Sequence, residues 1–442
     1  MAGATPTGDL GRTVAAAFGR LAKGVAAMFD VWGSAYRRLA ESHALAVVGD
    51  AAVAVALAGT LFFTVPATDA RENVALYLLL TLAPFAVVGP FLGRLFERMP
   101  GAYRGSLAAS GLGRAAVALG MIWTRESLWL FPLAFGLLVL SRLGGIARSS
   151  VLPVVVGDPN ALVAANARLA RIGVLAGGIG GAVVAFLVAV GGPPLGLVPA
   201  AVAFVASAVA AVQLPRLRVV PRGRDRGPRR LPRRVRLALF ATGGVRFLNG
   251  FLLLLFAFAL RDLAAGVASL GLFLGAAGAG YFLAAWAAPA IGGYVTEEPM
   301  VVAALAVEAG AAFIAGQVFD VGSLTVLVAA VVLAGAAGFA WGTAKFGFDG
   351  LLQASMPVDA RGRAFTFAES VLQLAWVFGA LLPVLPILPT GLGLAGAGVA
   401  ALVIQVVYVT LVLLPEAAGR RRDPDAAPPP ERRGDQGVLD LL

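Results

Sequence analysis

Three charged residues, Asp50, Arg142 and Arg246, interrupt long apolar runs of this sequence. A charge near the middle of a bilayer costs at least ~2.5–3.5 kcal/mol on insertion scales, so each is expected to face protein or water rather than lipid. At ~1.5 Å per helical residue, Asp50 lies roughly 10 Å from one end of its run. Arg142, on an antiparallel run, and Arg246 lie at similar depths. Together they could bind a solute and a transferable proton, or form a buried ion pair that only stabilises the fold.

A weak internal repeat adds two further charged candidates. Residues 113–120 and 307–314 have similar sequences, and this similarity places Arg114 and Glu308 at equivalent positions of two half-chains. Glu308 is a candidate for proton coupling or for a structural role. Arg114 is a candidate member of a structural charge pair.

Other polar and aromatic residues inside apolar runs could also contribute to a site. Glu369 is a third candidate for proton coupling, although it could instead pair with Arg361 or Arg363. Asn249, Gln373 and Trp341 are candidate groups of a substrate cavity.

The elements that must position these residues are transmembrane helices. Of the 442 residues, 59% are hydrophobic and 13% are charged, whereas soluble domains carry roughly 45–50% apolar and about 25% charged residues. The apolar residues come in runs of about twenty, which is long enough to cross a ~30 Å hydrocarbon core. The predicted spans are 44–65, 74–95, 105–123, 127–148, 163–190, 193–214, 237–260, 264–294, 299–317, 322–344, 365–388 and 391–414. The sequence therefore predicts an all-α integral membrane protein with about twelve transmembrane helices.

The charge distribution divides the chain into five parts. Residues 1–42 show helical spacing of apolar side chains, which favours an amphipathic helix on the inner membrane surface over a mobile tail and does not fit a signal peptide. Residues 43–214 and 237–414 are predicted to form two six-helix bundles, joined by a basic linker at 215–236. Residues 415–442 are rich in Pro, Arg and Asp and are expected to be disordered.

Loop charge predicts the orientation in the cell membrane. Basic residues gather in alternate loops, which places both termini in the cytoplasm. The basic residues assigned to these inner loops are Arg98, Arg104, Arg148, the arginines of the linker, Lys345, Arg361, Arg363, Arg420, Arg421 and Arg422. One inner loop, at 295–299, departs from the pattern because it offers Glu297 and Glu298 and no base.

Several kinds of chemistry lack the residues they require. The chain has no cysteine and a single histidine, His43, so neither a thiolate nor a multi-histidine metal site is expected. Lys23 is followed by Gly24 and Lys345 by Phe346, so neither lysine belongs to an ATP-binding P-loop. We therefore expect no enzyme activity, no cofactor, no metal and no ATP hydrolysis. The arginines lie in short loops between spans, so nucleic-acid binding is not expected either.

Four segments resemble the major facilitator superfamily, most closely its macrolide-efflux-type and siderophore-exporter-type branch. They are Gly49-Asp50 in the first span, a loop after the second span that contains Gly89, Gly93, Glu97 and Arg98, the connection 147–167, and the connection 352–365. The resemblance runs from about residue 43 to 414. The sequence departs from the family pattern where Glu97 replaces an aspartate and where Gly178 replaces a proline of the antiporter motif.

The resemblance implies a fold and a mechanism. It implies two pseudo-symmetric six-helix bundles that rock about a midplane site, with the first, fourth, seventh and tenth spans lining a cavity that Asp50, Arg142 and Arg246 would face. Glu97 and Arg98 would latch the inner side closed. The predicted function is proton-coupled export of a small amphipathic or hydrophobic compound by alternating access, with the lipid bilayer, protons and that compound as partners. A lipid or lipid-precursor flippase and a non-transporting scaffold or sensor are the alternatives.

Overall fold

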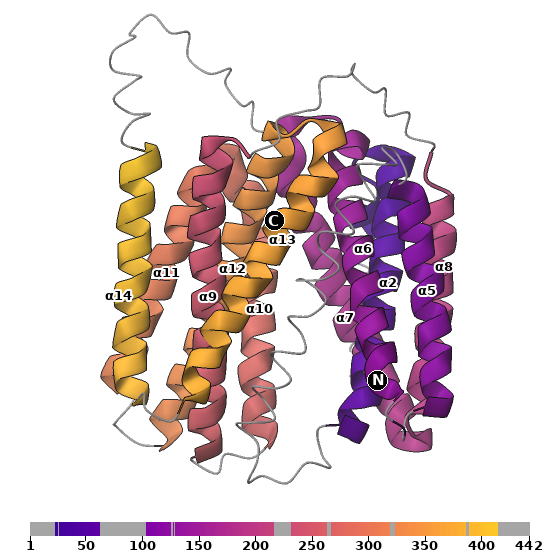
Figure 1. Ribbon diagram of the computed structural model, residues 1–442, viewed down its shortest axis with the longest axis horizontal. Helices are drawn as coiled ribbons and strands as arrows, with labels where there is room; N and C mark the ends of the chain where they lie inside the picture. The colour runs from indigo at the N-terminus through magenta and orange to yellow at the C-terminus, as the bar shows by residue number, and fades with distance from the viewer. Residues whose placement is uncertain are drawn as a thin grey trace, which may run out of the picture.

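The computed structural model describes residues 23–24, 26–61, 103–124, 127, 129–215, 231–262, 267–318, 323–385 and 389–413 (Figure 1). These residues form helices joined by short turns, and none of them lies in a strand. Eleven of the described helices are long and apolar enough to cross a membrane. The predicted all-α membrane fold is therefore confirmed. The remaining predicted span, 74–95, and the loop with Gly89, Gly93, Glu97 and Arg98 lie outside the described residues.

The described helices of the first half pack against one another. They are α2 (Gly33–Leu61), α5 (Tyr103–Thr124), α6 (Leu130–Val156), α7 (Leu162–Gly191) and α8 (Pro194–Val212), with a 3-10 turn at Pro159–Ala161. Gly157 and Gly192 follow α6 and α7 with φ values of 78° and 77°. This left-handed conformation is readily adopted by glycine and ends a helix.

The helices of the second half form another bundle. They are α9 (Arg233–Asp262), α10 (Val267–Tyr294), α11 (Glu297–Val318), α12 (Ser323–Ser355), α13 (Val358–Leu381) and α14 (Thr390–Tyr408), with a 3-10 turn at Leu382–Val384 and a π turn at Val409–Leu413. Glycines allow close crossings within this bundle. A Cβ atom at Gly250 would meet the backbone oxygen of Trp376, and one at Gly379 would meet that of Phe247. Helices α9 and α13 therefore cross with their backbones nearly in contact.

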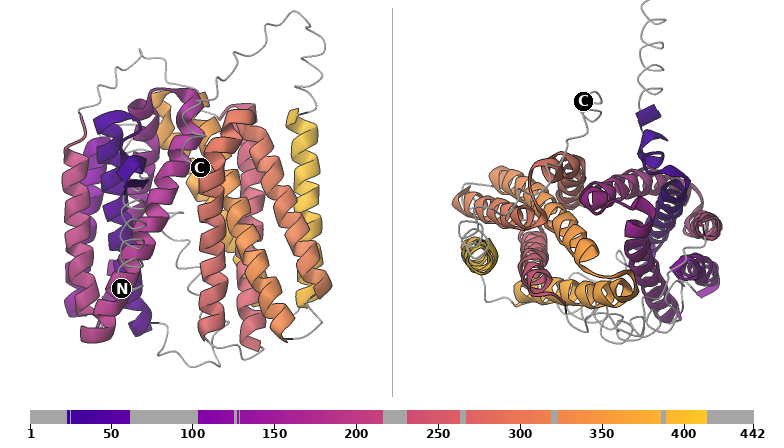
Figure 2. Two further views of the ribbon diagram at one scale, coloured as in Figure 1. Left: turned by 180° about the vertical axis from the view of Figure 1, so that it is seen from behind. Right: turned by 90° about the horizontal axis from the view of Figure 1, so that it is seen from above.

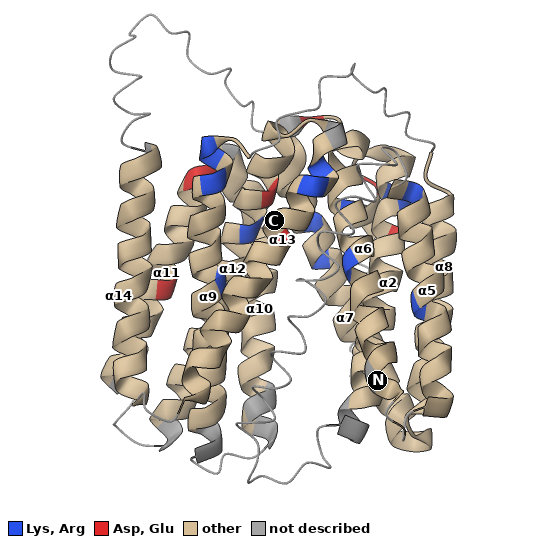
Figure 3. Cartoon of the chain, viewed as in Figure 1, with Lys and Arg blue, Asp and Glu red and all other residues tan. Residues whose placement is uncertain are grey.

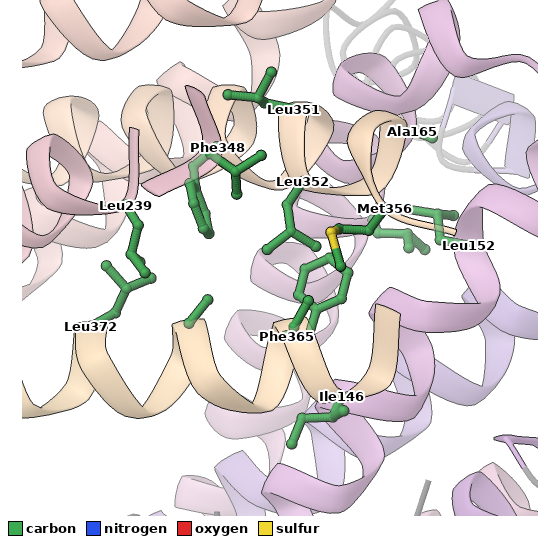
Figure 4. Close-up of a cluster of buried hydrophobic side chains, with 14 of the residues drawn as sticks. Ile146, Leu152, Ala165, Leu239, Phe348, Leu351, Leu352, Met356, Phe365 and Leu372 are labelled. Atoms are coloured by element: carbon green, nitrogen blue, oxygen red, sulfur yellow. The ribbon is translucent and has the colours of Figure 1, made fainter. Parts of the chain in front are cut away.

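The two bundles lie side by side (Figures 1 and 2), with α6 and α7 contacting α10, α12 and α13. They meet at the end where α6 turns into α7 and α12 into α13, which we call the closed end and which lies at the top of Figure 1. A buried apolar cluster crosses between the bundles there (Figure 4), and it includes Ile146, Leu152, Leu352, Met356 and Phe365.

Hydrogen bonds reinforce the closed end. Asn166 of α7 donates to Gln353 of α12 at 2.7 Å, and Gln353 donates to the backbone oxygen of Ser149 in α6 at 3.0 Å. One glutamine therefore ties together three helices from both bundles.

Several helix boundaries differ from the sequence prediction. α2 begins at Gly33 rather than at residue 44, α6 continues to Val156 and α12 to Ser355. The prediction that five basic residues lie in loops was therefore wrong, because all of them are inside helices: Arg104, Arg148, Lys345, Arg361 and Arg363. Hydropathy ended two predicted spans next to Arg148 and Lys345, whereas both side chains face inward and their helices continue past them. The predicted loop at 295–299 contains no basic residue, but its Glu298 forms an ion pair with Arg234 at the start of α9.

Candidate functional site

A cavity of about 640 Å³ lies between the bundles, with walls contributed by α2, α5, α6, α7 and α8 on one side and by α9, α10, α12 and α13 on the other. A volume of this size is typical of sites for small molecules. Its charged lining residues are Asp50, Arg114, Arg142, Arg148, Arg246, Lys345, Asp349 and Glu369. Figure 3 shows that charged residues of the described helices gather in the upper half of the view, toward the closed end.

Asp50 lies in an ion pair on the wall formed by the first bundle. Nη1 of Arg114 donates to both carboxylate oxygens of Asp50 at 3.1 Å, and the Ser141 hydroxyl donates to one of them at 3.3 Å. The Arg114 guanidinium also stacks over the Phe204 ring, 4.7 Å from its centroid. The Arg114 side chain is 5% exposed and that of Asp50 is 35% exposed. The aspartate is therefore the member of the pair that solvent or solute in the cavity can reach.

A second charge cluster forms the facing wall. Nζ of Lys345 lies 2.6 Å from a carboxylate oxygen of Asp349 and 2.8 Å from one of Glu369. Lys345 and Asp349 are one turn apart on α12, and Glu369 comes from α13. Two carboxyl groups therefore share one ammonium donor in this cluster.

Arg246 of α9 is held by aromatic rings. Its guanidinium lies 4.3 Å from the ring centroid of Trp341 and 5.5 Å from that of Trp376, as expected for cation–π contacts. Asn249 accepts a hydrogen bond from Arg246 at 3.4 Å and donates to the backbone oxygen of Ala337 at 3.5 Å. No ion pair between described residues includes Arg246.

The positive charge of Arg142 acts on charged residues of both walls. Arg142 follows Ser141 on α6, lines the cavity and interacts electrostatically with Asp50, Glu369 and Arg246. Nearer the closed end, Arg148 Nη1 lies 2.9 Å from Nε2 and 3.0 Å from Nδ1 of His43.

The structure brings together most residues that the sequence singled out. Asp50, Arg142 and Arg246 face the same cavity, as do Arg114, Trp341, Glu369 and Gln373. Asn249 does not line the cavity but positions Arg246.

Glu308 lies apart from this group. It is buried at 1% exposure on α11, outside the cavity lining, and neither of its carboxyl oxygens has a hydrogen-bond partner among the described residues. Its position argues against contact with a solute in the cavity.

Sequence reasoning missed Lys345, Asp349 and His43 as cavity residues. Lys345 and Asp349 are spaced i, i+4, which places both on one helix face and was a usable signal. Glu369 pairs with Lys345, a partner that had not been considered.

Solved structures share this arrangement of helices. A crystal structure of a bacterial homologue of the iron transporter ferroportin, in an outward-facing state, has a TM-score of 0.63 at 16% identity and covers 85% of this chain and 99% of that one. The major facilitator superfamily transporter FucP in the outward conformation gives 0.59 at 13% identity, covering 84% and 97%. The proton:xylose symporter XylE gives 0.58 at 15% identity, covering 85% and 94%. The chain is a multi-pass membrane protein with the major facilitator fold.

Sequence comparison defines the family more narrowly. The chain is 31% identical over 429 residues to the uncharacterized protein ML2143 of Mycobacterium leprae, and the alignment covers 84% of this chain and 71% of that protein. It is 39% identical over 143 residues to the uncharacterized protein Rv0876c of Mycobacterium tuberculosis, which covers 31% and 26%. No family model matches the chain. The chain belongs to the family of the M. leprae protein.

Proposed function

We propose that this protein is a secondary active transporter that exports a small amphipathic compound by alternating access, coupled to protons. The observation that carries the proposal is the cavity of about 640 Å³ whose walls come from both bundles and hold Asp50, Arg142 and Arg246 together. In the major facilitator fold the bundles rock about such a site. The charges would be costly to keep there without water or solute to face them.

Asp50 is the proposed proton carrier. It is the more exposed member of the pair with Arg114, so a proton arriving through the cavity would reach it first. For export, proton and solute would occupy the cavity in alternate half-cycles, so the protonated Asp50 would return with the empty cavity and release its proton before the next solute binds. Moving one charge through 100 mV supplies ~2.3 kcal/mol, which is enough to drive concentration of a solute.

The cavity favours a substrate that carries a negative charge beside an aromatic or apolar part. Its lining has five basic side chains and three acidic ones. Arg246, between Trp341 and Trp376, offers a cation on an aromatic surface. A phospholipid precursor has the same chemistry, so a flippase is the second candidate function.

We propose that the closed end faces the cytoplasm. The described basic residues gather toward this end (Figure 3), and the positive-inside rule places such ends in the cytoplasm. The macrolide-efflux-like sequence features motivate export. The structure would then correspond to a state in which the cytoplasmic side is shut.

Transport in everted vesicles tests the proposal. Fluorescein as an organic anion and ethidium as an organic cation are offered to vesicles with wild type, Asp50→Asn or Arg246→Gln, with and without a protonophore. We expect protonophore-sensitive uptake of the anion by wild type that both substitutions abolish. Asp158→Asn is the matched control, because Asp158 is exposed and outside the cavity. If transport is unchanged by the protonophore and by Asp50→Asn, the proposed proton coupling is wrong. If the purified protein instead moves a labelled phospholipid across the bilayer of liposomes, the flippase function is favoured.

A further inference from the structure

Two arginines of α7 lie away from the cavity. Arg168 and Arg171 are not among the residues that line it, although their neighbours Asn166, Leu169 and Ala170 are. Residues three apart on a helix lie on the same side. The two guanidinium groups therefore point together to a different side of α7.

That side faces lipid further along the helix. Ile179, Val183, Phe186 and Val190 are apolar and 56–71% exposed, and they recur every three or four residues. Ile179 follows Arg168 by eleven residues, which is three helical turns, so the arginine continues the same exposed face. Large exposed apolar side chains on a membrane-spanning helix are expected to contact acyl chains.

The length of α7 places the arginines at the membrane boundary. Its 30 residues span roughly 45 Å, whereas the hydrocarbon core needs about 20 residues. Twenty residues counted back from Val190 reach Arg171. Both arginines are therefore at the depth of the lipid phosphates, at the closed end.

The local surroundings offer donors but no anion. Nε of Arg168 and Nε of Arg171 are buried without a hydrogen-bond partner among the described residues, and so is the hydroxyl of Tyr36, a fully buried residue. This hydroxyl lies within electrostatic reach of both arginines, which also repel each other. No ion pair between described residues includes either arginine.

Nearby groups define the rest of the site. Two acidic residues close in sequence to Trp32 and Tyr36, Asp30 and Glu41, pair with Arg37 and Arg38 instead. Trp32 lies beside Arg168, with the guanidinium 5.5 Å from the ring centroid. Tryptophan is enriched at the membrane–water interface.

We propose that Arg168, Arg171 and Tyr36 form a binding site for the phosphate headgroup of an anionic phospholipid, on the outer surface of the first bundle beside α2. The two guanidinium groups bind the phosphate, the buried tyrosine hydroxyl lies behind them, and the acyl chains lie along Ile179, Val183 and Phe186. Basic sites between transmembrane helices bind lipid headgroups in this way. This site is separate from the cavity and does not depend on the proposed transport.

Lipid binding to the full-length purified protein tests the site. Native mass spectrometry in detergent counts bound phosphatidylglycerol as its concentration is raised, and phosphatidylcholine, glycerol phosphate and inorganic phosphate are titrated in parallel. Each arginine near a membrane surface adds about 1 kcal/mol of attraction to anionic lipid, so Arg168→Gln with Arg171→Gln is expected to weaken phosphatidylglycerol binding about 10- to 30-fold. Arg168→Lys with Arg171→Lys keeps the charges and should retain most of the binding.

The matched control is Arg233→Gln with Arg236→Gln. These arginines have the same spacing and are exposed at the start of α9, so their loss should leave the phosphatidylglycerol affinity unchanged. If both double substitutions weaken phosphatidylglycerol binding equally, the binding reflects general charge attraction and the proposal is overturned. Absence of phosphatidylglycerol binding by wild type, or equal binding of inorganic phosphate, would overturn it as well. Size-exclusion profiles that match wild type confirm that each variant is folded.

Discussion

Replacing either member of the Asp50–Arg114 pair should destabilise the protein by different amounts, although the same ion pair is lost. Asp50→Asn leaves Arg114 charged with its side chain only 5% exposed, whereas Arg114→Met leaves a carboxylate that is 35% exposed and still accepts from Ser141. Stranding a buried charge costs about 3–5 kcal/mol. A charge that water can reach costs much less.

We therefore expect Asp50→Asn to lower the free energy of unfolding by about 3 kcal/mol. Arg114→Met should lower it by about 1–2 kcal/mol, part of which is the lost cation–π contact with Phe204. The double variant should have about the same free energy of unfolding as Arg114→Met alone, because without the arginine no buried positive charge is left unpaired. The coupling between the two positions then equals the cost of Asp50→Asn, about 3 kcal/mol.

Unfolding in mixed micelles of increasing SDS content, followed by circular dichroism, measures these differences. Methionine keeps most of the arginine volume, so the cycle reports charge rather than a cavity. If Arg114→Met destabilises at least as much as Asp50→Asn, or if the two losses simply add, the burial argument is refuted. In that case the pair would not be the main determinant of how Asp50 is held.

Three further predictions use the same unfolding assay or cysteine labelling. Glu308→Leu should raise the free energy of unfolding by about 1–3 kcal/mol, because it removes a buried carboxyl without a described partner; a loss of stability would contradict this. Gly250→Ala should lower the free energy of unfolding by about 1–3 kcal/mol, because the new Cβ meets the α13 backbone. In the control, Gly243→Ala, the Cβ enters open space and should raise the free energy of unfolding by up to ~1 kcal/mol. Gln353→Leu removes the hydrogen bonds that join the bundles, so a cysteine introduced at Ser149 should be labelled roughly 5- to 100-fold faster; an unchanged rate would show that these bonds do not hold the end shut.

Hydropathy predicted the helices because exposing polar groups to lipid costs much free energy, and this cost depends only on the residues of the span itself. The runs around Asp50, Arg142 and Arg246 are apolar enough that each helix was found, and antiparallel counting placed the three charges at one depth. That these residues share one cavity was implied by the resemblance to the major facilitator superfamily, and the structure has such a cavity.

Partners across helices could not be predicted in the same way. Arg114 is 64 residues from Asp50, and the two meet because α2 and α5 both pack against α8, where Gly49 and Gly111 face Phe204. Nothing in the local sequence encodes that crossing. Lys345 was missed because of a local feature, its charge. This charge ended the predicted span, although the helix runs ten residues further to Ser355.

The unusual length of α12 has a mechanical consequence. Lys345, Asp349 and Gln353 recur every four residues, so the ammonium of the cavity and the amide that ties the bundles together are about 12 Å apart on one rigid rod. A solute that draws Lys345 away from Glu369 pulls on the same helix that carries the tie. In the proposed transport cycle, occupancy in the middle of the molecule and release at its end would then be linked through a single helix, with no intervening loop.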